Sequence, residues 1–304
     1  MILCCGEALI DMLPVPGPGA GPAFAPHAGG AVFNTAIALG RLGAPTGFFA
    51  GIAADFLGDI LRDTLAESKV DTSACVMAPR PSTLAFVKLV EGQATYAFYD
   101  ENTAGRMLTE ADLPAITEDA YFFGGISLVV DPCGATYEAL MGRAWAAGKV
   151  TMLDPNIRPG FITDEAAYRA RINRMIGLAD IVKLSLEDLA WLSGGKDEAF
   201  VQAMLDRGVS LVLLTDGGVG ATGVTPRGRL FEPARKVNVV DTVGAGDTFN
   251  AGVLASLNAC DRLSRDSLRD LDDSTLRAAL QLGAAAAAVT VSRAGANPPW
   301  PSEM

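Results

Sequence analysis

A run of small residues that ends in an acid is the segment of this sequence best suited to chemistry. Within residues 241–254, Gly244, Ala245 and Gly246 precede Asp247 and an apolar, helix-forming stretch. Small residues let backbone N–H groups converge on one point, and the N-terminus of the following helix adds a positive field, so this turn suits a phosphate or a developing anion. A carboxylate in the first helical turn can accept a proton from a hydroxyl during phosphoryl transfer. The alternative is that Asp247 only caps the helix.

The elements that must position this turn alternate between strand and helix patterns. Apolar runs typical of strands occur at residues 120–123, 150–153, 181–184 and 211–215, and helical patterns occur at 134–147, 165–176, 186–192, 198–207, after residue 246 and at 275–289. Such alternation predicts an α/β fold with a doubly wound, mostly parallel sheet. No repeat or break in composition divides the chain, so we expect residues 1–304 to form a single domain.

The first third of the chain has a different pattern. Short strands are expected at 2–5 and 8–13, followed by a Pro/Gly loop at 14–26 without a secondary-structure signal, and a helix runs from Gly29-Gly30 to Arg41. Residues 83–99 are rich in β-formers on both sides of a Glu-Gly turn, which predicts a hairpin. We expect the segments 8–26 and 83–100 to form a small β lid that excludes water from the sheet's edge.

Charge and composition exclude several classes of function. With 24 Lys and Arg against 35 Asp and Glu, the net charge of -11 argues against a nucleic-acid partner or an anionic membrane surface. Five scattered cysteines and one histidine, His27, favour a reducing cytoplasm over disulfides, structural zinc or a Ser-His-Asp triad. The longest apolar run, residues 121–130, is too short for a membrane span, and the N-terminus lacks the basic region of a signal peptide.

The common nucleotide-binding signatures do not apply to this sequence. A Gly-x-x-x-x-Gly-Lys-Ser/Thr loop does not occur. Gly218, Gly220 and Gly223 form a Gly-x-Gly-x-x-Gly pattern, but Val-Thr-Pro follows where a dinucleotide-binding fold needs a helix, so this pattern predicts a turn.

Four separated segments resemble a known family. They are Gly-Glu-Ala-Leu-Ile-Asp at residues 6–11, Gly-Gly-Ala-Val-Phe-Asn-Thr-Ala at 29–36, Asp-Pro-Asn-Ile-Arg-Pro at 154–159, and the stretch 241–254. Together they resemble the ribokinase-like sugar kinases, also called the PfkB family, and within it the chain is most similar to bacterial fructokinases. The resemblance covers nearly the whole chain, and it favours a catalytic role for Asp247 over a helix cap.

The resemblance implies a role for each matching residue. Asp247 matches the catalytic base that takes the proton from the sugar hydroxyl. The backbone of Gly244, Ala245 and Gly246 matches the anion hole for the transferring phosphate.

The sugar side is assigned in the same way. Asp11 matches a carboxylate that accepts hydrogen bonds from sugar hydroxyls, and Gly29, Gly30 and Asn34 match a second sugar-contacting motif. There the missing side chains allow close approach and the amide offers both donor and acceptor. Three further residues are expected near the sugar or the phosphate path: Phe98, Arg106 and Arg158.

The nucleotide side is implied by weaker matches. Thr215 and Gly217 resemble a strand-end Thr-x-Gly that contacts ATP phosphates, at the edge of an α/β sheet where ligands are expected. For Thr215 alone, an ordinary strand-to-turn role is equally compatible with the sequence. The remaining expected nucleotide contacts are Ser185, Gly220, Gly246 and Ala284, the last at a position where relatives often have Asn.

The metal ligands depart from the family pattern. Where the family has Asn-x-x-Glu near its magnesium ion, this chain has Ser185 and Asp188, and either Glu187 or Asp188 would hold Mg²⁺ through water. Relatives place contacts to a monovalent cation where Asp241, Val243 and Ser292 stand, so a potassium ion is also expected.

The resemblance implies an ATP- and Mg²⁺-dependent sugar kinase that makes fructose 6-phosphate, with a lid that can double as a homodimer surface. The alternative within the family is 2-keto-3-deoxygluconate kinase, whose acidic substrate would need a cation such as Arg158 or Arg106. A third hypothesis, from another class, is a non-catalytic sensor that binds sugar or nucleotide. An intact Asp247 argues against it, because a pure binder needs no base.

Overall fold

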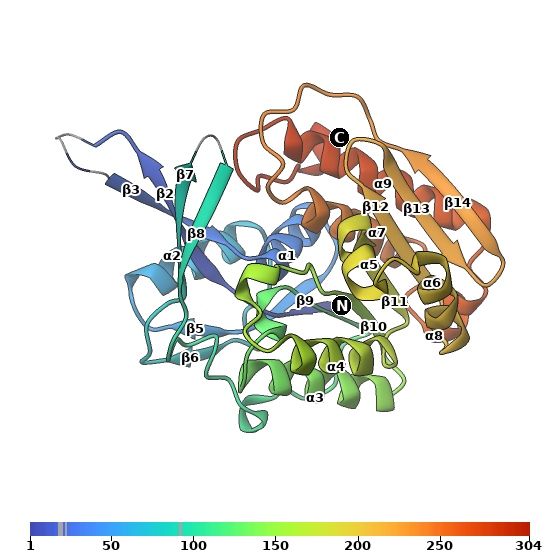
Figure 1. The fold of residues 1–304 in the computed structure, drawn as a ribbon, viewed down its shortest axis with the longest axis horizontal. Coiled ribbons are helices and arrows are strands. Elements are labelled where there is room, and N and C mark those ends of the chain that lie inside the picture. Colours follow the sequence, from blue (N-terminus) through green and yellow to red (C-terminus); the bar gives the residue numbers. More distant parts are fainter. Residues whose placement is uncertain (18–20, 22, 91–92) are drawn as a thin grey trace.

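The computed structural model describes residues 1–17, 21, 23–90 and 93–304, and an eight-stranded sheet forms its centre (Figure 1). The six strands from β12 to β4 run parallel, whereas β13 and β14 add an antiparallel edge, so the predicted mostly parallel α/β fold is confirmed. The strand order is β14 (Gly228–Pro233), β13 (Gly220–Thr225), β12 (Leu211–Asp216), β11 (Ile181–Ser185), β10 (Val150–Asp154), β9 (Ala120–Gly124), β1 (Ile2–Cys5) and β4 (Thr46–Phe49).

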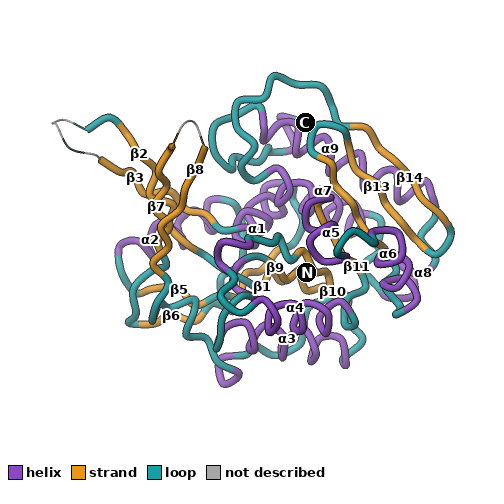
Figure 2. Tube along the Cα trace, in the orientation of Figure 1, coloured by secondary structure: helices purple, strands orange, loops and turns teal. Residues whose placement is uncertain are grey.

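Both faces of this sheet are buried under helices (Figure 2). Alternate strand residues point to opposite faces, so Ile2 and Cys4 join one apolar cluster while Leu3 and Cys5 join the other. The first cluster is covered by α1 (Ala31–Arg41), α2 (Phe56–Glu67), α7 (Ala245–Ala259), α8 (Arg265–Arg269) and α9 (Asp273–Val291). The second is covered by α3 (Cys133–Ala146), α4 (Glu165–Ile176), α5 (Leu186–Ser193) and α6 (Asp197–Asp206).

A separate four-stranded sheet, made of β2 (Leu9–Val15), β3 (Ala23–Gly29), β7 (Leu84–Val90) and β8 (Gln93–Tyr99), projects from this body (Figure 1). Its strand order is β3, β2, β7 and β8. These strands form the small β lid, and β2 follows β1 after residues 6–8, so the lid emerges at the carboxyl edge of the central sheet. The lid also contacts the body, since the Phe98 and Phe161 ring centroids lie 5.1 Å apart.

The expectation of an unstructured loop over 14–26 is wrong at its two ends. Residues 14–15 belong to β2 and residues 23–26 to β3, whose antiparallel register pairs Pro14 with Phe24. The Phe24 ring packs edge-on against Phe86 of β7 at 5.1 Å, and such a contact between distant segments cannot be detected in the local Pro/Gly composition. Residues 18–20 and 22 of the expected loop lie outside the described part of the chain.

Several elements were not expected from the sequence. They are α2, β4, a two-stranded parallel pair of β5 (Gly51–Ala53) with β6 (Val76–Ala78), and the β13–β14 hairpin. Of the three glycines predicted to form a turn, Gly218 lies in one, whereas Gly220 and Gly223 lie in β13. No helix follows them, as the sequence predicted. The single-domain organisation stays a prediction.

Helix α9 is the one helix of the described residues that is long and apolar enough to cross a membrane by length and composition. It packs along α7, and its buried residues include Leu276, Leu280 and Ala286. This packing accounts for its apolar character as that of a core helix.

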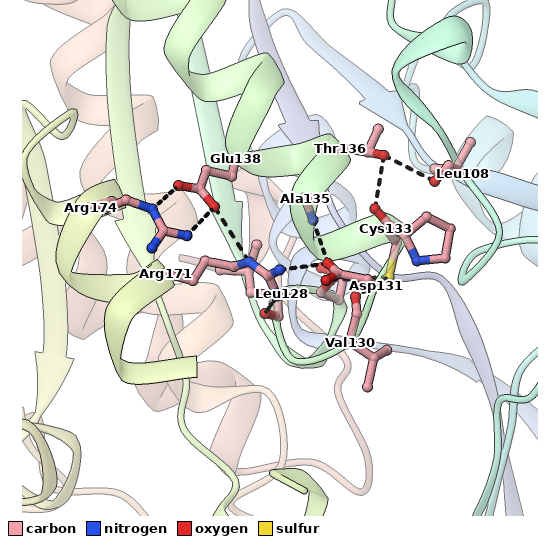
Figure 3. Close-up of polar contacts among 12 residues, drawn as sticks. Leu108, Leu128, Val130, Asp131, Cys133, Ala135, Thr136, Glu138, Arg171 and Arg174 are labelled. Atoms are coloured by element: carbon pink, nitrogen blue, oxygen red, sulfur yellow. Dashed lines mark hydrogen bonds and ion pairs between the residues drawn. The ribbon is translucent and has the colours of Figure 1, made fainter. Parts of the chain in front are cut away.

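Helices α3 and α4 hold the 3₁₀ turn η2 (Ile126–Leu128) that follows β9 (Figure 3). The guanidinium of Arg171 on α4 donates to the Leu128 carbonyl at 2.9 Å and pairs with Asp131, while Glu138 on α3 pairs with both Arg171 and Arg174. Charge-assisted bonds of this kind fix the turn beyond the carboxyl end of β9.

The contact between α7 and α9 predicts a local sensitivity to side-chain size. A Cβ added at Gly252 of α7 would lie 2.6 Å from the Gly283 Cα of α9, which is too close without a backbone shift. We expect Gly252→Ala to lower the free energy of unfolding by about 1–3 kcal/mol. The matched control is Gly142→Ala in α3, where a Cβ meets nothing within 4 Å, and which should raise stability by up to about 1 kcal/mol. Urea unfolding measures both, and equal effects would contradict this packing.

Candidate active site

The turn before α7 has the conformation that the small residues predicted. Gly244 caps the helix with φ 76°, a left-handed conformation that glycine adopts without strain, and a Cβ there would lie 2.7 Å from the Ala296 Cβ. The first amides of an α-helix have no carbonyl one turn back, so those of the α7 N-terminus can bind an anion. Gly244, Ala245, Gly246 and Asp247 all line one cavity of about 340 Å³.

Asp247 is buried in this first turn and is held from helix α1. Its carboxylate accepts a hydrogen bond from the Asn34 Nδ2 at 2.9 Å, and its carbonyl accepts one from the Thr35 hydroxyl at 3.2 Å. Burial raises the pKa of Asp247 to about 7, because it outweighs the hydrogen bond from Asn34, which by itself lowers this pKa. The carboxylate therefore ionises near neutral pH, which suits a general base.

The sugar-side residues converge on the same cavity from the other side. Asp11 on β2, Gly30 and Asn34 line it, and burial raises the pKa of Asp11 to about 6. Gly29 does not line the cavity, but a Cβ on it would lie 2.3 Å from the Asp11 Oδ2, so this glycine leaves the space that the Asp11 carboxylate fills. Gly30, the second glycine of the pair, has φ 112°, a backbone conformation that residues with a side chain rarely adopt.

The three further candidates near the sugar divide between two cavities. Phe98 and Arg158 line the cavity that contains Asp247. Arg158 is exposed, and its Nη1 donates to its neighbour's carbonyl, that of Ile157, at 3.0 Å. Arg106 instead lines an adjacent cavity of about 830 Å³ and pairs with Asp100 at 3.8 Å, so the structure places it beside the catalytic cavity rather than in it.

Of the predicted nucleotide contacts, Gly246 lines the cavity of Asp247, whereas Ser185, Thr215 and Gly217 lie at the carboxyl ends of β11 and β12 and do not line it. Ser185 pairs in register with Thr215, and Gly217 follows with φ 41°. Gly220 has a packing role, because a Cβ there would lie 2.3 Å from the Glu232 carbonyl on β14. Ala284 lies half-buried on α9. These positions as nucleotide contacts stay predictions.

The two predicted magnesium ligands, Asp188 and Glu187, differ in burial and in the hydrogen bonds that their carboxylates already accept. Asp188 forms a capping box with Ser185 at the start of α5, and its other oxygen accepts the Ile157 N–H at 3.0 Å. Glu187 is exposed. Among the described residues no group of three or more His, Cys, Asp or Glu could hold a metal by itself. A magnesium ion that keeps its waters and is held mainly by nucleotide phosphates is compatible with this arrangement.

The predicted potassium ligands lie together where the loop before α7 meets the end of α9. The Asp241 carboxylate accepts N–H bonds from Val243 at 3.1 Å and Gly295 at 2.9 Å, and its own N–H donates to the Val291 carbonyl. Ser292 caps the C-terminus of α9, and its hydroxyl donates to the Val289 carbonyl at 2.7 Å. These positions as contacts to a monovalent cation stay predictions.

Sequence reasoning missed several residues of the cavity. Glu7 is buried and accepts the Ala31 N–H at 2.8 Å and the Ser127 N–H at 3.4 Å, so it ties the starts of α1 and η2 together. Lys183 and Asn156 also line the cavity, and Asn156 has φ 43°, which is uncommon outside glycine. Asn156 lies inside a recognised motif from which only Arg158 was selected, so that motif was the available signal.

The comparisons with known proteins agree with this geometry. Residues 1–303 match the model of the pfkB family carbohydrate kinases. A fructokinase from Rhizobium leguminosarum bv. trifolii is 58% identical over 280 residues, which cover 91% of this chain and 86% of that protein.

Solved structures match over similar lengths. A fructokinase from Xylella fastidiosa with bound ATP has a TM-score of 0.89 at 32% identity, covering 97% of this chain and 93% of that one. A double mutant of the fructokinase from Vibrio cholerae O395, with fructose, ADP and potassium ion bound, has a TM-score of 0.85 at 26% identity and the same coverages, 97% and 93%. The chain, with its buried acid at a helix N-terminus, belongs to the pfkB family of carbohydrate kinases.

Proposed function

We propose that this carbohydrate kinase transfers the γ-phosphoryl group of ATP to the 6-hydroxyl of fructose, with Asp247 as the general base. The observation that carries the proposal is the position of Asp247: a buried carboxylate beside the amides of the α7 N-terminus, in a cavity that also contains Asp11 and Asn34. The fructokinase relatives support fructose as the acceptor.

The step follows from this geometry. The fructose 6-oxygen forms a bond to the γ-phosphorus while the bond from that phosphorus to the β,γ-bridging oxygen breaks, and ADP leaves with that electron pair. Asp247 takes the hydroxyl proton, and the backbone of Gly244 to Gly246 stabilises the equatorial phosphate oxygens. Asp11 and Asn34 hold the sugar, so the reacting oxygen is positioned before transfer. Phe98 on the lid contacts Phe161 on the body, and such closure excludes water from the γ-phosphate.

The metal ions are part of the same proposal. Mg²⁺, held through water by Glu187 or Asp188, would neutralise phosphate charge. K⁺ would be held by the Asp241 carboxylate with oxygens of Val243 and Ser292. The Vibrio cholerae relative with potassium ion bound supports the second ion.

Two broader expectations complete the proposal. A cytoplasmic location is supported by five cysteines that are all free thiols. A homodimer through the lid is supported by large apolar side chains exposed on it, Phe24 at 36% and Tyr99 at 62%. A purified chain that sediments only as a monomer would contradict the dimer.

Asp247→Asn should separate catalysis from stability. Without a base, turnover should fall by about 10²- to 10⁴-fold while fructose binding, measured by calorimetry, changes little. Burial raises the pKa of Asp247 from 3.8 to about 7. The folded protein therefore has its full stability below pH 3.8, where the carboxyl is neutral in both the folded and the unfolded chain, and loses stability as the pH rises from 3.8 through about 7. Asparagine stays neutral, so the variant should be more stable than the wild type by about 1–4 kcal/mol at pH 8.

At pH 5 both proteins hold a neutral group at this position, so the stability difference should shrink. Denaturant unfolding at the two pH values measures it. Near-normal turnover of the variant would overturn the assignment of the base.

A panel of sugars, assayed by ADP release with ATP and Mg²⁺, tests the acceptor. We expect fructose to be the best substrate in kcat/KM, because Glu7, Asp11 and Asp247 make the cavity unfavourable for an acidic sugar. Preference for 2-keto-3-deoxygluconate would overturn fructose and point to Arg158 as the cation for its carboxylate. Binding of sugar without ATP consumption would instead favour a sensor.

Running the same panel in sodium and in potassium buffers tests the monovalent ion. Equal rates in the two buffers would contradict a role for potassium.

A further inference from the structure

Lys183 on β11 is a buried cation that the mechanism above does not use. Its side chain is 5% exposed, and its Nζ lies 3.0 Å from the Asp154 Oδ2 on the neighbouring strand β10. Lysine is rarely buried, because removing an ammonium from water is unfavourable unless a partner compensates it. The ion pair with Asp154 therefore holds the positive charge of Lys183 in a fixed place beside the cavity.

The Lys183 ammonium lies next to the turn at residues 244–246, whose amides can bind a phosphate. A Cβ added at Gly246 would be 3.1 Å from the Lys183 Nζ, and Lys183 lines the same cavity as Asp247. Burial by itself would lower the pKa of Lys183, but Asp154 and then Asp188 outweigh it and raise the pKa, so the lysine stays protonated. The missing side chain of Gly246 thus leaves room for the Lys183 ammonium next to the turn.

Asp154 fixes this cation to the rest of the site. The Oδ2 that pairs with Lys183 also accepts the Asn250 Nδ2 at 2.7 Å, and the Oδ1 accepts the Asn156 N–H at 3.1 Å. Asn250 lies one helical turn after Asp247 on α7, so one carboxylate connects the lysine to the helix that carries the base. The Asn250 Oδ1 is buried without a hydrogen-bond partner.

We propose that Lys183, held by Asp154 and Asn250, is a positioning residue of the phosphoryl-transfer centre. Its fixed charge acts through the turn at Gly246 and stabilises the negative charge that the γ-phosphoryl group carries in transfer. Among the described residues that line the cavity, the other cation is Arg158, which is exposed to solvent and has no acidic partner in an ion pair. A preorganised charge in a water-poor site stabilises a transition state more than a mobile one does. This inference rests on the proposed function.

The charges that face Asp247 determine the expected pH effect. Asp154 on β10 and Glu7 after β1 raise its pKa, while Lys183 on β11 and the Asn34 amide on α1 lower it. Asp11 and Arg158 share the cavity. Loss of Lys183 alone should therefore move the acid limb of the kcat profile to higher pH.

The test compares Lys183→Met, the double variant Lys183→Met/Asp154→Asn, and the control Lys149→Met. The double variant removes both charges, so it leaves no unpaired buried ion and should fold. Lys149 lies before β10 at the amino edge of the sheet, where its Nζ is 3.5 Å from the Thr117 carbonyl. We expect the double variant to lose about 100-fold or more in kcat with the fructose KM changed by less than about threefold, and the control to be unaffected.

A binding measurement separates this role from a structural one. ADP with aluminium fluoride mimics the transferring phosphoryl group, and in the presence of fructose its affinity should fall about 100-fold in the double variant, while that of ADP alone stays within about threefold. If the double variant does not fold, Lys183→Gln, which keeps a donor to Asp154, carries the same expectations.

Wild-type kcat and wild-type affinity for ADP with aluminium fluoride, in whichever of these two variants folds without the Lys183 charge, would overturn the proposal. That result differs from failure of the proposed function, in which the wild type itself would phosphorylate no sugar.

Discussion

The site depends on one interaction: the contact between the N-termini of α1 and α7 that buries Asp247. The Asn34 amide and the Thr35 hydroxyl both reach this residue from α1, over more than 200 positions of sequence. The contact fixes the Asp247 carboxylate relative to the backbone amides of the α7 N-terminus and relative to the glycine pair that opens α1. A carboxylate in such a place is desolvated, so its pKa rises toward the pH at which a base is most useful.

The rest of the structure keeps this buried acid functional. Gly244 and Gly30 have positive φ angles at the two helix starts, where a Cβ would come too close to Ala296 and to Glu7, respectively. The lid places Asp11 and Phe98 over the cavity and so limits water, which strengthens each electrostatic interaction inside it. Burial of ionisable groups such as Asp247, Asp11 and Glu7 lowers stability at neutral pH, which is expected where function requires charge.

The sequence allowed prediction of the alternating α/β body and of the turn around Asp247, because hydrophobic periodicity and small-residue spacing are local signals. Strands β2 and β3 were missed in part, since Phe24 and Phe86 meet only in the folded chain. Lys183 and Asp154 were not predicted as a pair, because 29 residues separate them and a lone lysine in a strand has no motif. Arg106 follows the hairpin in sequence, but its ion pair with Asp100 directs it to the adjacent cavity.

Whether the buried Asp247 carboxylate acts as the base can be measured from the pH dependence of kcat/KM for fructose in the wild type. The base must be ionised to accept the proton, so the rate should fall tenfold per pH unit on the acid side, with the bend near the raised pKa of Asp247, about 7. A profile that stays flat down to pH 5 would contradict the account, because it would mean that the essential group has the pKa of an ordinary solvent-exposed carboxyl.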